Sequence, residues 1–278
     1  MSAPIVTPDG KWIINLAAAT LAIASGAVPV TAAAVTINPA TVSIALAPPP
    51  AAQPPAVPSN MVTVNALPMT GWEMNHDAGT SGSSTGTTSY PVTAPDGTTN
   101  CRLFDFTNSG GGGEIYHFPI LSDCTPYNKF RFRFRRTASP NVTNSEHDLE
   151  AVDAQGNPLD MATQEDGYNG VFDITENHKW VGVGSIKVNP ATWVAGSWHE
   201  DQIYLTDNGN GTVTYDGVLL DGVYYAIGIT IADVDGSKWT PKILNVQIQF
   251  DTKPPAGVTG GVESKVYCSE CAVDCWKA

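Results

Sequence analysis

The chain has 278 residues, of which 42% are hydrophobic and only 15% are charged, and its net charge is −13. The length suffices to bury a full-sized core, while 26 Gly and 21 Pro indicate turns and strands rather than helices. The acidic balance argues against binding a nucleic-acid backbone or an anionic membrane.

The first 60 residues differ in composition from the rest. Residues 12–47 are rich in Ala, Val, Ile and Thr without any charge, and a Pro-rich run follows to residue 58. A signal peptide and a membrane span are both poor interpretations, because Asp9 precedes a mostly Ala stretch that Gly26 and Pro29 interrupt. Two β-like runs at 35–37 and 42–46, followed by an extended spacer, instead predict an assembly arm over 1–60.

Short β-like runs separated by turn residues occupy 61–255. The clearest is 130–136, Phe-Arg-Phe-Arg-Phe-Arg-Arg, in which three Phe face a core and Arg131, Arg133 and Arg135 face the other way. Residues 75–100, dominated by Gly, Ser and Thr, are expected to form a long loop. Further strands are expected at 99–108, 114–120, 170–175, 180–188, 198–206, 213–220, 223–231 and 243–250. This pattern predicts an all-β, antiparallel two-sheet sandwich over 61–255, followed by a Cys-containing tail at 256–278.

Three acidic residues alternate along one predicted strand. Glu146, Asp148 and Glu150 share one face of it, while Leu149 and Ala151 take the other. Three neighbouring carboxylates repel one another, so the arrangement needs cations, a metal ion or a catalytic use.

A charge ladder is one explanation of the acidic strand. If Arg131, Arg133 and Arg135 lay beside it, opposite charges would pair across the two strands. Such pairs would keep the pKa values of the carboxyls low, which is unfavourable for a general acid.

Three segments in order resemble the concanavalin A-like lectin/glucanase superfamily, which includes laminin G-like and glycoside hydrolase family 16-like domains. They are Glu-His-Asp-Leu-Glu at 146–150, the Gly-Ser-Trp-His strand and Asn-Gly turn within 196–218, and the closing strand at 243–251. The resemblance implies a curved jelly roll of two sheets.

Within that superfamily, residues 146–150 match the Glu-x-Asp-x-Glu motif of family 16 glycoside hydrolases. The resemblance implies Glu146 as nucleophile, Asp148 as its modulator and Glu150 as general acid/base of a retaining endo-glycanase. Two carboxyls about 5–5.5 Å apart are required, whereas Cα atoms four apart on a strand are roughly 13 Å apart, so the side chains must lean together. Residues 137–145 lack the aromatics that usually stack sugars in that family, and the sequence therefore favours a non-enzymatic, lectin-like sheet.

Other candidate sites are weaker. Trp180, Trp198, Tyr168 and Arg133 are candidate glycan-binding residues, although most tryptophans in a sandwich anchor the core. Asp233 and Asp235 flank a turn that offers oxygens to Ca²⁺, which leaves a calcium-dependent lectin open beside a solvated turn. No other cofactor is expected.

Five cysteines stand at 101, 124, 268, 271 and 275, and their odd number leaves at least one without an intrachain partner. Disulfides are favoured over a metal site or free thiols, with Cys101–Cys124 and one bond involving Cys268, Cys271 or Cys275 as the candidate pairing. Disulfides would place the protein outside a reducing cytosol.

These features together predict a structural and binding protein. The arm would join it to other structural chains, in a homo-oligomer, and the sandwich would engage a cell-surface glycan. A phage virion surface component, such as a capsid decoration, head-fibre or tail appendage protein, fits this pattern. A secreted family 16-like glycanase is the enzymatic alternative.

Overall fold

A computed structural model describes residues 5–6, 12–13, 52–76, 83–109, 113–121, 123–152, 158–166, 170–176, 179–184, 186–187, 197–232, 244–252 and 261–278. By its contacts the chain divides into two units, 1–50 and 51–278. In the first unit, β1 (Ile5–Val6) pairs antiparallel with β2 (Trp12–Ile13). The strands expected at 35–37 and 42–46 lie outside the described residues.

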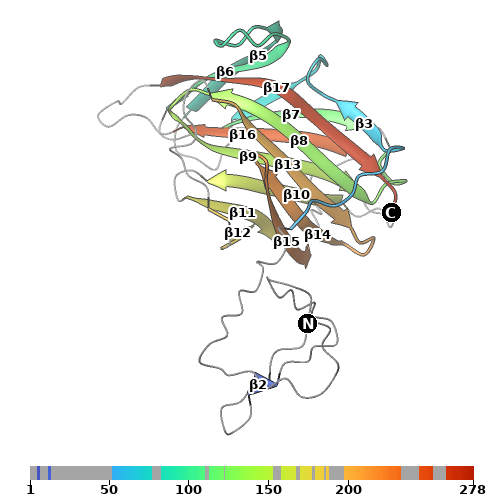
Figure 1. Cartoon of the computed structure of the whole chain (residues 1–278). Coiled ribbons are helices and arrows are strands. Elements are labelled where there is room, and N and C mark those ends of the chain that lie inside the picture. Colours follow the sequence, from blue (N-terminus) through green and yellow to red (C-terminus); the bar gives the residue numbers. More distant parts are fainter. Residues whose placement is uncertain are drawn as a thin grey trace, which may run out of the picture. The chain divides into compact units, whose positions relative to one another are not determined.

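The second unit consists of two antiparallel β-sheets (Figure 1). The seven-stranded sheet has the order β12 (Lys179–Gly182), β11 (Val171–Glu176), β10 (Pro158–Asp166), β9 (Val142–Val152), β16 (Leu244–Thr252), β7 (Gly113–Leu121) and β4 (Glu73–His76). The eight-stranded sheet contains β15 (Val223–Ala232), β14 (Thr212–Leu220), β13 (His199–Asp207), β8 (Lys129–Ala138), β17 (Val262–Trp276), β6 (Cys101–Ser109) and β5 (Ser83–Val92), and β3 (Val62–Asn65) pairs with β17.

The chain crosses repeatedly between the two sheets. Consecutive strands β7, β8 and β9 alternate between sheets, as do β15, β16 and β17, so the central strands of each sheet are distant in sequence. No helix occurs among the described residues. The two-sheet jelly roll expected from the strand pattern and from the resemblance is therefore confirmed.

Two expectations about the ends of the domain were wrong. Within the expected loop at 75–100, residues 83–92 form β5, which pairs with β6 because its Thr residues suit a pleated strand. The expected tail contains β17, a 15-residue strand between β8 and β6. Its cysteines are small enough to pack there as buried apolar side chains.

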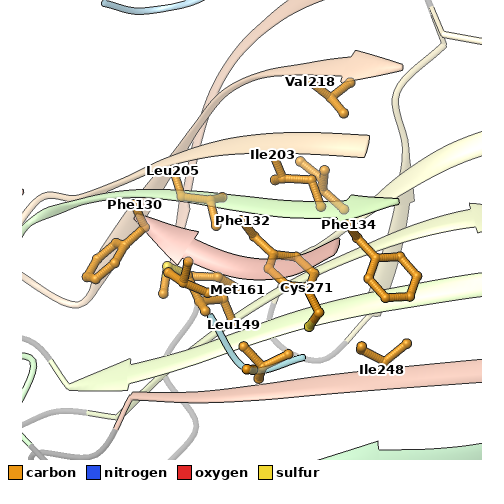
Figure 2. Close-up of a cluster of buried hydrophobic side chains, with 14 of the residues drawn as sticks. Phe130, Phe132, Phe134, Leu149, Met161, Ile203, Leu205, Val218, Ile248 and Cys271 are labelled. Atoms are coloured by element: carbon orange, nitrogen blue, oxygen red, sulfur yellow. The ribbon is translucent and has the colours of Figure 1, made fainter. Parts of the chain in front are cut away.

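The core lies between the sheets and is built on β8, as predicted. Phe130, Phe132 and Phe134 are almost completely buried and face Leu149 and Ile248 of the opposite sheet (Figure 2). Burying a side chain of this size contributes roughly 1.5–3 kcal/mol. Alternation of Phe with Arg along β8 thus fixes which face of the strand turns inward.

The cysteines do not form the expected disulfides. All five are free thiols and all are buried. Burial raises the pKa of Cys271 and Cys275 to about 12, so both are protonated and unreactive at neutral pH. The spacing that suggested disulfides places these side chains in the core instead.

Among the described residues, no helix is both long and apolar enough to cross a membrane.

Candidate functional site

The acidic strand β9 lies near the middle of the seven-stranded sheet, between β10 and β16. Leu149 and Ala151 point into the core, as the alternation predicted. Glu146, Asp148 and Glu150 therefore occupy the opposite face, which we call the polar face of the seven-stranded sheet.

On the polar face, two of the three carboxylates accept hydrogen bonds from side-chain amides. Gln164 Nε2 of β10 and Gln249 Nε2 of β16 both donate to Glu146 Oε1, at 2.8 and 3.2 Å. Gln247 Nε2 donates to Asp148 Oδ2 at 2.6 Å. Two of these donors, Gln247 and Gln249, belong to the alternating pattern of β16, in which Asn245 is opposite Glu150 in the register. Neutral hydrogen-bond donors of neighbouring strands thus contact Glu146 and Asp148.

The predicted charge ladder between Arg131, Arg133, Arg135 and the acidic strand was wrong. β8 and β9 are consecutive in sequence but belong to different sheets. Arg131 and Arg133 instead bind Asp274 on β17, through Nε–Oδ2 distances of 2.7 and 2.9 Å. Sheet membership, which the sequence pattern does not give, decides the pairing.

One row of register partners crosses the polar face perpendicular to the strands. Gln249, Glu146, Gln164, Asp173 and Gly182 follow one another from β16 to β12. Burial, and then the charge of Asp166, raise the pKa of Asp173. From Gln249 to Asp173 the row therefore alternates amides with carboxyls across four strands, and Gly182 of the fifth strand adds no side chain.

An exposed tryptophan lies at the end of this row. Trp180 on the edge strand β12 is 41% exposed. It stands two residues before Gly182, where an added Cβ would lie 3.4 Å from Asp173 Oδ1, so Trp180 points to the same polar face. Glu146 is three strands away, which corresponds to roughly 14 Å at ordinary strand spacing.

Accessibility varies along the polar face. Asp148, Glu150, Gln164 and Gln249 are buried, whereas Glu146 is half-buried. Glu146 and Trp180 are therefore accessible, whereas the side chains of Gln164 and Asp173, which lie between them, are buried.

The described residues contain no group of three or more His, Cys, Asp or Glu side chains arranged to hold a metal ion. Asp233 and Asp235, the candidate calcium ligands, lie outside the described residues, as does Tyr168. Among the other candidate glycan-binding residues, Trp180 belongs to the seven-stranded sheet, whereas Arg133 and Trp198 lie on or beside the eight-stranded sheet. The structure separates the predicted glycan-binding residues onto two sheets.

A charged cluster that was not predicted from the sequence lies between the sheets. Arg136 of β8 points inward and binds Asp201 of β13 and, at 3.2 Å, Glu165 of β10. His147 Nε2 lies 3.6 Å from Asp201 and 3.0 Å from Ser145 Oγ.

The protonation of this cluster follows from its burial. Burial, and then the charge of Arg136, lower the pKa of His147 well below its usual value. Burial raises the pKa of Asp201 well above the usual range even though Arg136 opposes the shift. The sequence signal for this cluster is the pair of consecutive arginines, Arg135 and Arg136, at the end of the Phe-Arg alternation. Because alternate residues of a strand share a face, Arg136 points inward with the phenylalanines.

No protein-family model matches the sequence, and no curated protein matches it. Several solved structures share part of its fold. Cellulose-induced protein Cip1 is 14% identical, with a TM-score of 0.41, over 76% of this chain and 96% of that one. A Bacillus licheniformis β-glucanase is 12% identical, with a TM-score of 0.37, over 78% and 98%. A structure described for carbohydrate-binding modules of the β-sandwich superfamily is 11% identical, with a TM-score of 0.37, over 74% of this chain and 60% of that one.

This chain therefore spans less than two thirds of the carbohydrate-binding-module structure. Similarities with TM-scores of 0.37 to 0.41 do not indicate a function. The jelly-roll assignment rests on the strand order of the chain itself.

Proposed function

We propose that this protein binds a neutral polysaccharide without cleaving it, along the polar face of the seven-stranded sheet. The observation that carries the proposal is the part of the polar face from Glu146 to Trp180, which combines two carboxyls, the amide of Gln164 and one exposed aromatic ring. Sugar hydroxyls donate to carboxylates and exchange hydrogen bonds with amides, while an indole ring covers the apolar face of a pyranose.

The five residues of the row include no Lys, Arg or His, which supports a neutral ligand. Glu146 accepts from Gln164 and Gln249, and neither donor carries a charge. An anionic ligand would approach the carboxyls of Glu146 and Asp173, and like charges at this range repel. A hydroxyl-rich, uncharged chain meets no such penalty.

The binding test is a calorimetric titration of neutral β-glucan hexasaccharides into the full chain. We expect Trp180→Ala to weaken binding about tenfold or more, because a large buried contact is lost. Val181→Ala is the matched control, since Val181 is 38% exposed on the same strand and its register partner Ile174 faces the core. Equal affinities for the wild type and Trp180→Ala would contradict the proposal.

A retaining glycanase is the second candidate, and one observation favours it. Both amides donate to the same oxygen of Glu146, and hydrogen bonds of this kind stabilise an ionised carboxylate such as a nucleophile requires. Release of reducing ends from a glycan panel would support this candidate, and Glu146→Gln would then abolish turnover while binding persists. We expect no turnover by the wild type.

We further propose that the protein is displayed on a phage virion surface, where residues 1–60 join it to other chains as a homo-oligomer. The support is the Pro-rich composition of this segment, which has no charged residue after Lys11, and the separation of residues 1–50 as a unit of their own. Light scattering should give an oligomer for the full chain and a monomer for residues 51–278. If the full chain and residues 51–278 contained the same number of chains per particle, the assembly role would be contradicted. A secreted location is the alternative.

A further inference from the structure

A groove of about 500 Å³ lies on the outer face of the eight-stranded sheet, on the opposite side of the sandwich from the polar face. Its floor is formed by β8, β17 and β3, and one wall is the segment between β5 and β6. Apart from Ala272, every residue that lines it is polar or charged. The volume is within the usual range of small-ligand sites.

Two of the three outward arginines of β8 are neutralised locally. Arg131 Nη2 and Arg133 Nε lie 2.6 and 2.9 Å from Asp274 Oδ2, and the Asp274 side chain is fully buried. Arg133 also binds Glu270. These contacts hold the floor of the groove rigidly and leave Arg133 little capacity for a ligand.

Arg135 differs from its two neighbours. Its one hydrogen bond within the described part of the chain runs from Nη1 to Ser269 Oγ, at 2.9 Å. Its register partners are Glu270 and Glu200, but Glu270 is engaged by Arg133 and Glu200 accepts from Gln202 at 2.6 Å. A guanidinium has five N–H donors, so most of those on Arg135 remain available to a ligand.

An indole ring fixes the guanidinium of Arg135. The carbon at its centre lies 4.5 Å from the ring centroid of Trp198. Trp198 Nε1 in turn donates to Asp96 Oδ2 at 2.6 Å, and Asp96 Oδ1 accepts the backbone N–H of Thr98 at 3.0 Å. The hydrogen bond from Trp198 is the main reason that the pKa of Asp96 is lowered. Stacking of this kind orients a planar guanidinium before any ligand arrives.

The surroundings of Arg135 are rich in hydroxyl groups. Thr63, Thr98, Thr99 and Ser269 line the groove together with the Asn65 amide. The groove offers no apolar side chain larger than Ala272 to hold a peptide, and its surroundings include Glu270 and Asp274, which disfavour a polyphosphate backbone. A polyhydroxylated ligand bearing a single planar carboxylate suits this set of groups best.

We propose that this groove is a second saccharide site, which recognises the carboxylate of a uronic acid unit through the stacked guanidinium of Arg135. A carboxylate accepts two parallel N–H bonds from one guanidinium, a geometry that lysine does not offer. The ring hydroxyls of the same unit bind Thr98, Thr99 and Asn65. The site is independent of the neutral-glycan site on the other sheet.

The test is calorimetry of the full chain with a galacturonate tetrasaccharide and with its methyl ester, which removes the negative charges and keeps the ring hydroxyls. We expect the acid to bind and the ester to bind roughly 10- to 100-fold more weakly, since hydrogen bonds to charged groups contribute about 1.5–3 kcal/mol. Arg135→Gln and Arg135→Lys should both lose binding by a similar factor. Lys265→Gln, which removes an exposed cation elsewhere, should change nothing.

Two further readouts separate this site from the rest of the molecule. The indole N–H resonance of Trp198 should shift on addition of the acid, and Trp180→Ala should leave uronate binding intact. Equal binding of acid and ester, unchanged affinity of Arg135→Gln, or no heat of binding at millimolar uronate would each overturn the proposal. A failure of neutral-glycan binding alone would leave it standing, because that result concerns the other sheet.

Discussion

Arg135 and Arg136 are neighbours in the sequence, yet strand β8 sends them to opposite environments. Arg136 is enclosed between the sheets with Asp201, Glu165 and His147. Arg135 lies on the outer face, stacked on Trp198 and without a carboxylate partner in the described part of the chain. Two identical side chains thus have different surroundings, because successive residues of a strand point to opposite faces of the sheet. We propose a ligand contact only for the outer one.

The largest effect expected from this comparison is the loss of the buried arginine. Arg136→Met should destabilise the protein by about 3–5 kcal/mol, because it leaves Asp201 and Glu165 buried without their cation. Urea denaturation followed by tryptophan fluorescence measures this change. Arg135→Met is the matched control on the adjacent position, and we expect it to cost less than about 1 kcal/mol.

Equal losses in stability for the Arg136 and Arg135 variants would contradict the division between an interior and an exterior arginine. A higher free energy of unfolding for Arg136→Met than for the wild type would contradict it as well. That result would mean that protonation alone relieves the repulsion between Asp201 and Glu165.

Acidification should destabilise the protein through His147. The pKa of this histidine is lowered in the folded state, so below about pH 6.5 the unfolded chain binds one proton more than the folded chain. The free energy of unfolding should therefore decrease as the pH is lowered through this range. His147 contributes up to about 1.4 kcal/mol per pH unit to this decrease. Asp201, whose pKa is raised, acts in the opposite direction: its stabilising effect diminishes as the pH rises above 3.8.

The variant His147→Gln isolates the contribution of the histidine. Urea midpoints at pH 7.5, 6.5 and 5.5 should show a shallower pH dependence for this variant than for the wild type. Parallel curves for the two proteins would mean that the pKa of His147 is the same in the folded and unfolded states, which would contradict its lowering by burial.

The smallest expected effect concerns the cysteines. Addition of dithiothreitol should change the free energy of unfolding by less than about 0.5 kcal/mol, because all five cysteines are buried free thiols. Loss of a native disulfide typically costs about 2–5 kcal/mol. A destabilisation of that size, or fewer than five thiols titrated after unfolding without reductant, would contradict the free-thiol assignment.

The sequence pattern predicted the individual strands better than it predicted which strands pair in a sheet. Alternation of Phe and Arg located β8, and the acidic alternation gave the correct two faces of β9. The same patterns do not say which strands pair, since partners such as β9 and β16 are brought together only by the crossings between sheets. The charge ladder was wrong for this reason.

Elements with weak apolar signals were missed. β5 contains mostly Ser, Thr and Gly, and only its pairing with β6 makes it a strand. In β17, the Cys spacing suggested cross-links and concealed a strand whose thiols and valines face the core. Asn245, Gln247 and Gln249 alternate with apolar residues in the sequence, but their role depends on lying opposite the acidic strand.

The polar face of the seven-stranded sheet is tested most directly by the side-chain amide resonances of Gln164, Gln247 and Gln249 during titration with a neutral β-glucan hexasaccharide. Sugar hydroxyls that reach Glu146 must perturb the amides that donate to it. We predict saturable shifts of the Gln164 and Gln249 signals together with the Trp180 indole, and smaller shifts at Gln247. Saturable binding that leaves these signals in place and moves only residues of the eight-stranded sheet would contradict the account.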